Sequence, residues 1–323
     1  MQRVVRHCAA LLLLTFACAA CGAGSAESPS TVALAVARLA RAPVPGEPVR
    51  IVVRSPVPLA SLETRFLDQD VFMARAGGAE ELWSGWTLIG LDQEPTIAAI
   101  VAGGRTVDGR AAAGTLAMRI DEKSFPEERL AVAESFVEPP RETRERLARE
   151  RERLDAIYAL RTAPVPERAF VPPVPGPPTS VFGTRRFFND RPRSPHPGLD
   201  LRAAGGTPVV AAGPGSVALA ADLYYSGNTV ILDHGGGLFT LYAHLERIDV
   251  AEGDRLRAGD KLGLSGATGR VTGPHLHWGA KVGDRPFDPR ALLDSSLFDP
   301  LRVSAPRTPP APPEASPAVS SDR

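Results

Sequence analysis

The chain has 323 residues, with 37 Lys and Arg against 37 Asp and Glu, so its formal net charge is zero. A protein whose main partner is nucleic acid needs an excess of basic residues, and this charge balance argues against that class. Hydrophobic residues make up 43% of the chain, which is enough for ordinary globular cores, and the length indicates about two domains.

The N-terminal segment has the layout of a secretory signal peptide, which we predict over residues 1–21. Two arginines precede an apolar run from Cys8 to Ala20, and this run is shorter than the roughly 20 residues of a membrane-spanning helix. The letters CAACG resemble a bacterial lipobox, in which Cys21 becomes the lipidated first residue and anchors the protein to a membrane. Ordinary cleavage near Ala26 is the alternative. We therefore expect an exported protein of the periplasm or cell envelope.

Residues 31–137 are predicted to form an N-terminal immunoglobulin-like β-sandwich. The run 49–53 alternates at the period of a half-buried strand, and turn residues such as Pro-Gly, Gly-Gly and Asp-Gly separate several runs of this kind. No cluster of His or carboxylates here indicates chemistry, so the domain is interpreted as a spacer or interaction domain. Trp83 and Trp86 are interpreted as core residues, with an exposed ligand-binding pair as the alternative.

The rest of the chain divides into four segments by composition. Residues 140–162 carry an apolar stripe at helical spacing among paired charges, which predicts a charged helix that packs on a neighbouring domain. Residues 163–178 are rich in Pro and predict an extended linker or strap. Residues 179–297 contain short β-branched runs between Gly turns and predict an all-β domain. The Pro-rich tail, 303–323, is predicted to be disordered.

The histidines indicate a metal site in the second domain. All three cysteines lie in the first 21 residues, so a site elsewhere must use His and carboxylates. His275 and His277 alternate on a strand and point to one face, which suits one ligand and one adjacent acid or base. His196 and Asp200 can supply two further ligands if the chain folds back at Gly198. Two imidazoles and one carboxylate are the ligand count of a catalytic zinc site.

Three stretches together carry a family resemblance: SPHPGLDL, then GNTVILDHGGGLFTLYAHL, then GDRLRAGDKLGLSGATGRVTGPHLHWG. They resemble the lysostaphin-type, LytM-like zinc endopeptidases of bacterial cell walls, over about a third of the chain. The resemblance implies that His196, Asp200 and His277 bind one Zn²⁺, and that His244 and His275 flank the catalytic water. Some members of this family have lost their ligands and activate other wall enzymes, and the intact ligand positions argue against that fate here.

The chemistry follows from this site, although two assignments stay open. One of His244 and His275 takes a proton from the water and returns one to the leaving amine, while the other donates to the developing oxyanion. The resemblance implies peptidoglycan stem peptides as the substrate, cross-linked either by glycine bridges or by D-alanyl bonds to a diamino acid. His234, in LDHGGG, is interpreted as structural.

Four arginines lie just before His196: Arg185, Arg186, Arg191 and Arg193. They are interpreted as a group that holds substrate carboxylates, with a solvated loop as the alternative.

We therefore expect a mainly β protein, with the β-sandwich, a helical connector and a LytM-like peptidase domain, that acts as a zinc-dependent peptidoglycan endopeptidase in cell wall remodelling. A catalytically silent or autoinhibited wall-binding regulator is the first alternative. The second is a carrier-like module, because AEGDRLRAGDKLGLSG is similar to the glycine-spaced hairpins of biotinyl and lipoyl domains. Such a module has no use for His196, Asp200 or His277.

Overall fold

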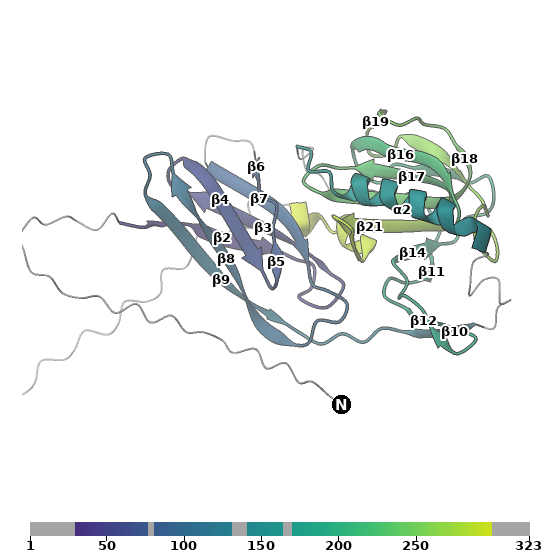
Figure 1. Cartoon of the computed structure of the whole chain (residues 1–323), viewed down its shortest axis with the longest axis horizontal. Helices are drawn as coiled ribbons and strands as arrows, with labels where there is room; N and C mark the ends of the chain where they lie inside the picture. Colours follow the sequence, from purple (N-terminus) through teal and green to yellow (C-terminus); the bar gives the residue numbers. More distant parts are fainter. Residues whose placement is uncertain (1–29, 77–80, 131–140, 164–169, 299–323) are drawn as a thin grey trace, which may run out of the picture.

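The computed structural model describes residues 30–76, 81–130, 141–163 and 170–298. The predicted signal peptide, the proposed anchor at Cys21 and the Pro-rich tail lie outside these ranges. The described chain is mainly β, as expected, with two groups of sheets side by side and one α-helix (Figure 1). No helix within the described ranges is long and apolar enough to cross a membrane.

The N-terminal part consists of two antiparallel sheets that share one core. The first sheet has the strand order β1 (Val32–Ala33), β9 (Ala111–Ile120), β8 (Thr96–Thr106), β4 (Leu59–Phe66), β5 (Gln69–Asp70). The second has the order β2 (Ala35–Leu39), β3 (Pro48–Ser55), β7 (Glu81–Leu88), β6 (Ala74–Ala76). Within the described strands of these two sheets, only β1 joins its neighbour in parallel. Alternate residues of both sheets, such as Ile51, Phe66 and Met118, fill the space between them.

The expectation of a half-buried strand at 49–53 is wrong for one face of β3. Val49, Ile51 and Val53 enter the core between the two sheets, as their alternation predicts. The intervening Arg50 and Val52 are only 3% and 1% exposed. They are covered because the outer face of β3 packs on the second part of the chain, and a local period cannot reveal such a partner.

The second part of the chain contains a large sheet that surrounds the predicted site. Its main path is β11 (Pro178–Ser180), β14 (Gly198–Leu201), β21 (Leu276–Val282), β18 (Leu238–Ile248), β17 (Gly227–Asp233), β16 (Gly215–Leu223), β19 (Arg255–Leu256). Three further strands join it: β15 (Pro208–Val210), β20 (Lys261–Ser265) and β22 (Arg285–Phe287). Tyr242, Trp278 and Phe287 are fully buried in its core. Thus β14, β21 and β18 are adjacent strands, and they carry three of the five predicted site residues: Asp200, His277 and His244.

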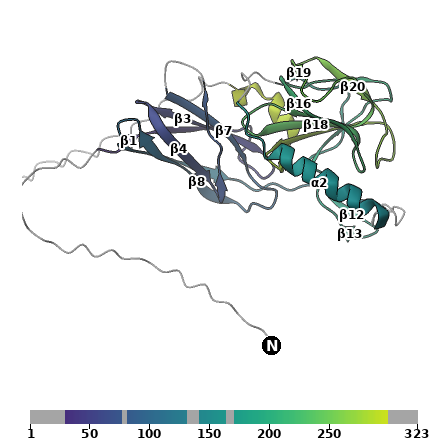
Figure 2. The same ribbon diagram turned by 45° about the horizontal axis from the view of Figure 1, so that its top comes forward.

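The predicted charged helix is α2 (Arg144–Tyr158), which follows a short 3₁₀ turn, η1 (Arg141–Thr143). It lies against the sheet near β16 and β18 (Figures 1 and 2), where Ile157 and Tyr158 pack with Leu219 and Phe239. The described part of the Pro-rich segment, residues 170–178, packs on the large sheet. Its Phe170 is buried in the core of the large sheet, together with two 3₁₀ turns near the end of the domain, η2 (Pro289–Leu293) and η3 (Ser295–Phe298).

A small third sheet connects the two parts. It has the order β10 (Glu127–Leu130), β12 (Arg185–Phe188), β13 (Arg191–Pro192). β10 falls within the range 31–137 that the sequence assigns to the first domain, yet it pairs in parallel with β12 of the second. Figure 1 shows this sheet beside β11 and β14. The chain that leaves the sandwich is therefore attached close to the strand that carries Asp200.

The two parts meet through a contact surface that combines apolar and charged groups. Trp86 lies 5.8 Å from Phe298 between ring centroids, so it is a core residue and not an exposed ligand-binding residue. The Arg41 guanidinium contacts the buried carboxylates of Glu47, at 2.5 Å, and of Asp288 in the second part, at 3.0 Å. The Arg50 guanidinium donates to the carbonyl of Leu297 at 3.2 Å, and burial lowers its pKa to about 10.

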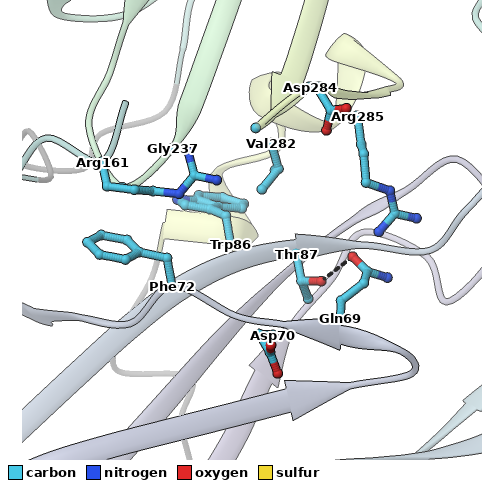
Figure 3. Close-up of a pocket in the computed structure, with 12 residues that line it drawn as sticks. Gln69, Asp70, Phe72, Trp86, Thr87, Arg161, Gly237, Val282, Asp284 and Arg285 are labelled. Atoms are coloured by element: carbon cyan, nitrogen blue, oxygen red, sulfur yellow. Dashed lines mark hydrogen bonds between the residues drawn. The ribbon is translucent and has the colours of Figure 1, made fainter. Parts of the chain in front are cut away.

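A cavity of about 260 Å³ remains at this border, between β7 and the β21–β22 turn. Figure 3 shows Trp86, Arg161 and Val282 around it, with the Thr87 hydroxyl donating to the Gln69 amide oxygen at 2.9 Å. No histidine lines this cavity. It belongs to the contact between the two parts, and the candidate site lies elsewhere.

We predict that Arg41→Ala lowers the free energy of unfolding by about 2 kcal/mol, because it removes a cation from two buried carboxylates. Urea denaturation of the full chain measures the change. The matched control is Arg119→Ala, since Arg119 and Asp121 form an exposed ion pair that contributes under about 1 kcal/mol. Equal losses in the two variants would contradict the role assigned to Arg41.

Candidate metal centre

The register of two neighbouring strands places the first two candidate ligands opposite each other. β14 and β21 are antiparallel, and Asp200 is the direct partner of His277. Residues opposite each other in such a pair point to the same face of the sheet. Nδ1 of His277 lies 2.8 Å from Oδ1 of Asp200, and the two side chains are 14% and 13% exposed. The two polar side chains thus form a partly covered pair on one face of the sheet.

His196 approaches this pair from the segment that precedes β14. Its backbone N–H donates to the carbonyl of Thr184 at 2.9 Å, and its side chain is 1% exposed. Nδ1 lies 3.0 Å from the carbonyl oxygen of Val181, which can only accept a hydrogen bond, so Nδ1 carries the proton. Nε2 therefore presents a lone pair, 3.0 Å from Oδ1 of Asp200 and 3.1 Å from Nδ1 of His277.

Three donor atoms that converge in this way fit a divalent cation. Two imidazole nitrogens and one carboxylate oxygen lie 2.8 to 3.1 Å from one another, and one proton at most can lie between any two of them. Tetrahedral zinc, with bonds of about 2.0–2.1 Å, places its ligand atoms about 3.3 Å apart. Within the described ranges, one group of His, Cys, Asp or Glu side chains converges closely enough to hold a metal ion, and it consists of His196, Asp200 and His277.

The charge state of Asp200 suits a metal ligand. Burial alone would favour the neutral acid, but the neighbouring imidazoles of His196 and His277 outweigh it and hold the pKa of this carboxyl well below its usual range. Its second oxygen, Oδ2, lies 3.2 Å from the Arg186 guanidinium. Burial lowers the pKa of His277, which keeps that ring neutral. An anionic oxygen and neutral imidazoles are the forms in which these groups bind metals.

Gly198 serves the site in a different way from the one the sequence suggests. The residue lies inside β14 and is paired with Gly279, so the chain does not fold back there. A Cβ atom at this position would lie 2.7 Å from the ring of His277 and 2.6 Å from the carbonyl of Trp278. Glycine is therefore required because the His277 ring occupies the space of a side chain.

His244 and His275 flank the three candidate ligands. His244, at φ +63°, is one of the non-glycine residues with a left-handed backbone, and its Nδ1 donates to the carbonyl of Thr268 at 2.9 Å. Nδ1 of His275 donates to the carbonyl of Gly273 at 2.9 Å. The two rings lie 5.0 Å apart, and Nε2 of His275 lies 3.7 Å from Oδ1 of Asp200. Both histidines therefore keep Nε2 available as an acceptor, and burial lowers the pKa of His244 to about 4.

His234 has the structural role that its turn suggests. It is buried, and both ring nitrogens are bonded, Nδ1 to the carbonyl of Pro214 at 2.6 Å and Nε2 to the Thr240 hydroxyl at 2.7 Å. The ring of Phe170 packs on it edge-on, 4.8 Å away between centroids. Burial lowers the pKa of this histidine to about 4.

Comparison with known proteins identifies the domain that holds the site. Residues 194–289 match the model of Peptidase family M23. This stretch, which holds all five candidate site residues, is therefore similar to the peptidases of that family. The peptidoglycan DD-endopeptidase ShyA of Vibrio cholerae is 43% identical over 111 residues, which are 34% of this chain and 26% of that protein. The DD-carboxypeptidase/endopeptidase Mpg of Neisseria meningitidis is 43% identical over 94 residues, 29% of this chain and 22% of that one.

The chain therefore spans about a quarter of the length of these curated relatives. The wider architecture also has a counterpart, a crystal structure from Pseudomonas aeruginosa assigned to peptidase M23. It is 27% identical, with a TM-score of 0.57, and the match covers 79% of this chain and 96% of that one. The M23 match leaves no support for the carrier-like module, and Lys261 of that stretch is paired with Asp249 at 2.9 Å.

The structure brings all five predicted site residues together and gives one of the four arginines an unexpected place. Arg186 contacts Asp200, whereas the sequence suggests a substrate or solvent contact for it. The carbonyls of Val181, Thr268 and Gly273, which orient three of the rings, also go unnoticed in the sequence. No sequence signal marks them, because any residue supplies a carbonyl.

We predict that the stability of the protein falls as the pH drops from about 6.5 towards 4, partly because of His234. Its pKa is lower in the folded chain than the ordinary value, so the unfolded chain binds the proton first and stability is complete only above about 6.5. The contribution lost is roughly 3 kcal/mol. Urea unfolding at several pH values should give a flatter profile for His234→Gln, and an unchanged slope would refute this assignment.

Proposed function

We propose that the chain is a zinc-dependent endopeptidase that hydrolyses peptide cross-links of bacterial peptidoglycan. The observation that carries this proposal is the convergence of His196, Asp200 and His277 within the stretch that matches peptidase family M23. The names of two relatives, each 43% identical over the matched region, support a DD-endopeptidase, which cleaves between two D-configured residues. The intact donor set argues against a catalytically silent regulator.

His196, Asp200 and His277 would hold one Zn²⁺, because two neutral imidazoles and one carboxylate leave a fourth coordination position open. When bound, zinc supplies a Lewis acid that polarises the scissile carbonyl and activates a water at neutral pH. No cysteine or serine nucleophile is then needed, which is consistent with the absence of cysteine beyond residue 21.

The two flanking histidines would move the protons. With Nδ1 fixed on the carbonyls of Thr268 and Gly273, His244 and His275 each offer Nε2 to the reacting groups. One would accept a proton from the attacking water and pass it to the leaving amine, and the other, when protonated, would donate to the oxyanion. Their near-equivalent geometry leaves both assignments available.

The cellular setting and the first domain complete the proposal. A peptidoglycan substrate and the signal-like N-terminus support a cell-envelope location, with Cys21 as a lipid anchor.

The first domain would be an immunoglobulin-like sandwich. The strand orders β2-β3-β7-β6 and β9-β8-β4-β5 support this, because they correspond to the ABED and GFC arrangement of that fold. It would serve as a spacer or interaction domain.

We predict that His277→Ala loses bound zinc, whereas His244→Ala keeps it. His277 supplies one of the three donor atoms, and His244 is bonded only to a carbonyl in the described structure. Elemental analysis of both purified proteins after dialysis measures the zinc content. Stoichiometric zinc in His277→Ala would contradict the ligand assignment.

We further predict that the wild-type protein releases soluble fragments from purified sacculi, and that chelation abolishes this activity. His244→Ala should slow release by about 10²- to 10⁴-fold, the usual contribution of a general acid or base. Mass analysis of digests from sacculi with DD cross-links and from sacculi with glycine bridges distinguishes the two specificities. No soluble fragment from either substrate would reject the hydrolase.

A further inference from the structure

The two oxygens of the Asp200 carboxylate contact different partners. Oδ1 lies within 3.0 Å of both His196 and His277, whereas Oδ2 lies 3.2 Å from the Arg186 guanidinium. The same guanidinium group donates to Ser180 Oγ at 3.3 Å. A planar guanidinium fork has fixed donor directions, so it holds an oxygen in place better than a flexible ammonium does. Arg186 thus fixes which oxygen faces the candidate metal centre.

Arg186 is itself held by a residue from outside the second domain. Its Nε donates to Glu128 of β10 at 3.2 Å, and the parallel register makes Glu128 the direct partner of Arg186. Arg186 is 24% exposed and Glu128 is 37% exposed, so the pair is partly shielded from water. The result is a chain of three charges, Glu128, Arg186 and Asp200, that leads from β10 to the site.

β10 is attached to this position by several independent contacts. Arg129 lies over the Phe187 ring, 4.3 Å from its centroid, and pairs with Asp190 at 3.1 Å. Asp190 belongs to the tight β12–β13 turn, where it and Asn189 have left-handed backbones. These contacts give Glu128 a defined position relative to Arg186.

We propose that Arg186 is a positioning residue for the metal ligand Asp200, and that Glu128 tunes metal affinity through Arg186. Both residues precede the stretch 194–289 that matches the M23 family. The inference rests on the proposed metal site. The segment between the two parts of the chain would then control how tightly the catalytic domain binds its metal ion.

Two effects of Arg186 oppose each other, and their sizes decide the direction. A cation near the site repels Zn²⁺, but Glu128 neutralises this charge at 3.2 Å, so the net repulsion is small. Fixing the carboxylate removes the cost of orienting it when the ion binds, and residues that orient ligands typically contribute 10- to 100-fold in metal affinity. The orienting effect is therefore the larger one.

The test measures the zinc dissociation constant of the full-length protein by competition with a chromogenic chelator. Arg186→Ala should weaken zinc binding by about 10-fold or more, and Arg186→Lys should restore part of the loss because an ammonium can still contact Oδ2. The matched control is Arg185→Ala, at the exposed neighbouring position on the same strand, which should bind zinc as the wild type does. Melting of the metal-free variants checks that all are folded.

A double-mutant cycle tests the role of Glu128. Glu128→Gln alone should weaken zinc binding by about threefold, the size of a partly exposed ion pair. In the Arg186→Ala background it should have no further effect, because it acts through Arg186. Glu127→Gln, on the same strand, is the control.

The outcomes separate this inference from the proposed function. Wild-type zinc binding with unchanged affinity in Arg186→Ala overturns the positioning role and leaves the metal site intact. Additive effects of Glu128→Gln and Arg186→Ala overturn the coupling through Arg186. A wild-type chain that binds no zinc overturns both proposals. Equal weakening in the Arg185→Ala control also rejects the inference, since the loss would then not depend on the contact with Asp200.

Discussion

The candidate site depends on one register, the pairing of β14 with β21 that sets Asp200 opposite His277. A slip of one residue would turn both side chains to the other face of the sheet. The neighbouring pair prevents such a slip, because Leu199 and Trp278 are buried in the core on the opposite face. The same hydrophobic packing that stabilises the domain therefore fixes the geometry of the polar pair.

A second level of order comes from backbone carbonyls. Val181, Thr268 and Gly273 each accept a hydrogen bond from one imidazole and so determine which ring nitrogen keeps its lone pair. Val181 directly follows β11, whereas Thr268 and Gly273 both lie in the connection between β20 and β21. Three of the four candidate site histidines, His196, His244 and His275, thus have the same kind of support, whereas His277 contacts Asp200.

Much of the site could be predicted from the sequence, because its signals are local. The spacing of His275 and His277 requires only the period of a strand, and the His196 to Asp200 spacing falls in a short motif. Features that depend on distant segments could not be predicted in this way. The second buried face of β3, the attachment of β10 to β12 and the contact of Arg186 with Asp200 all arise from partners far along the chain. The role of Gly198 went unrecognised for the same reason, since the ring that fills its space comes from β21.

These long-range contacts also define the size of the functional unit. The M23 match begins at residue 194, yet the His196 ring is fixed by Val181 and the Asp200 carboxylate by Arg186. Arg186 in turn contacts Glu128, and Asp288 of the second part contacts Arg41 of the first. Within its described residues the first part supplies no candidate ligand, but Glu128 contacts the arginine that in turn contacts Asp200. The geometry of the candidate site therefore depends on residues outside the matched stretch, which contains the candidate ligands but not all of the groups that position them.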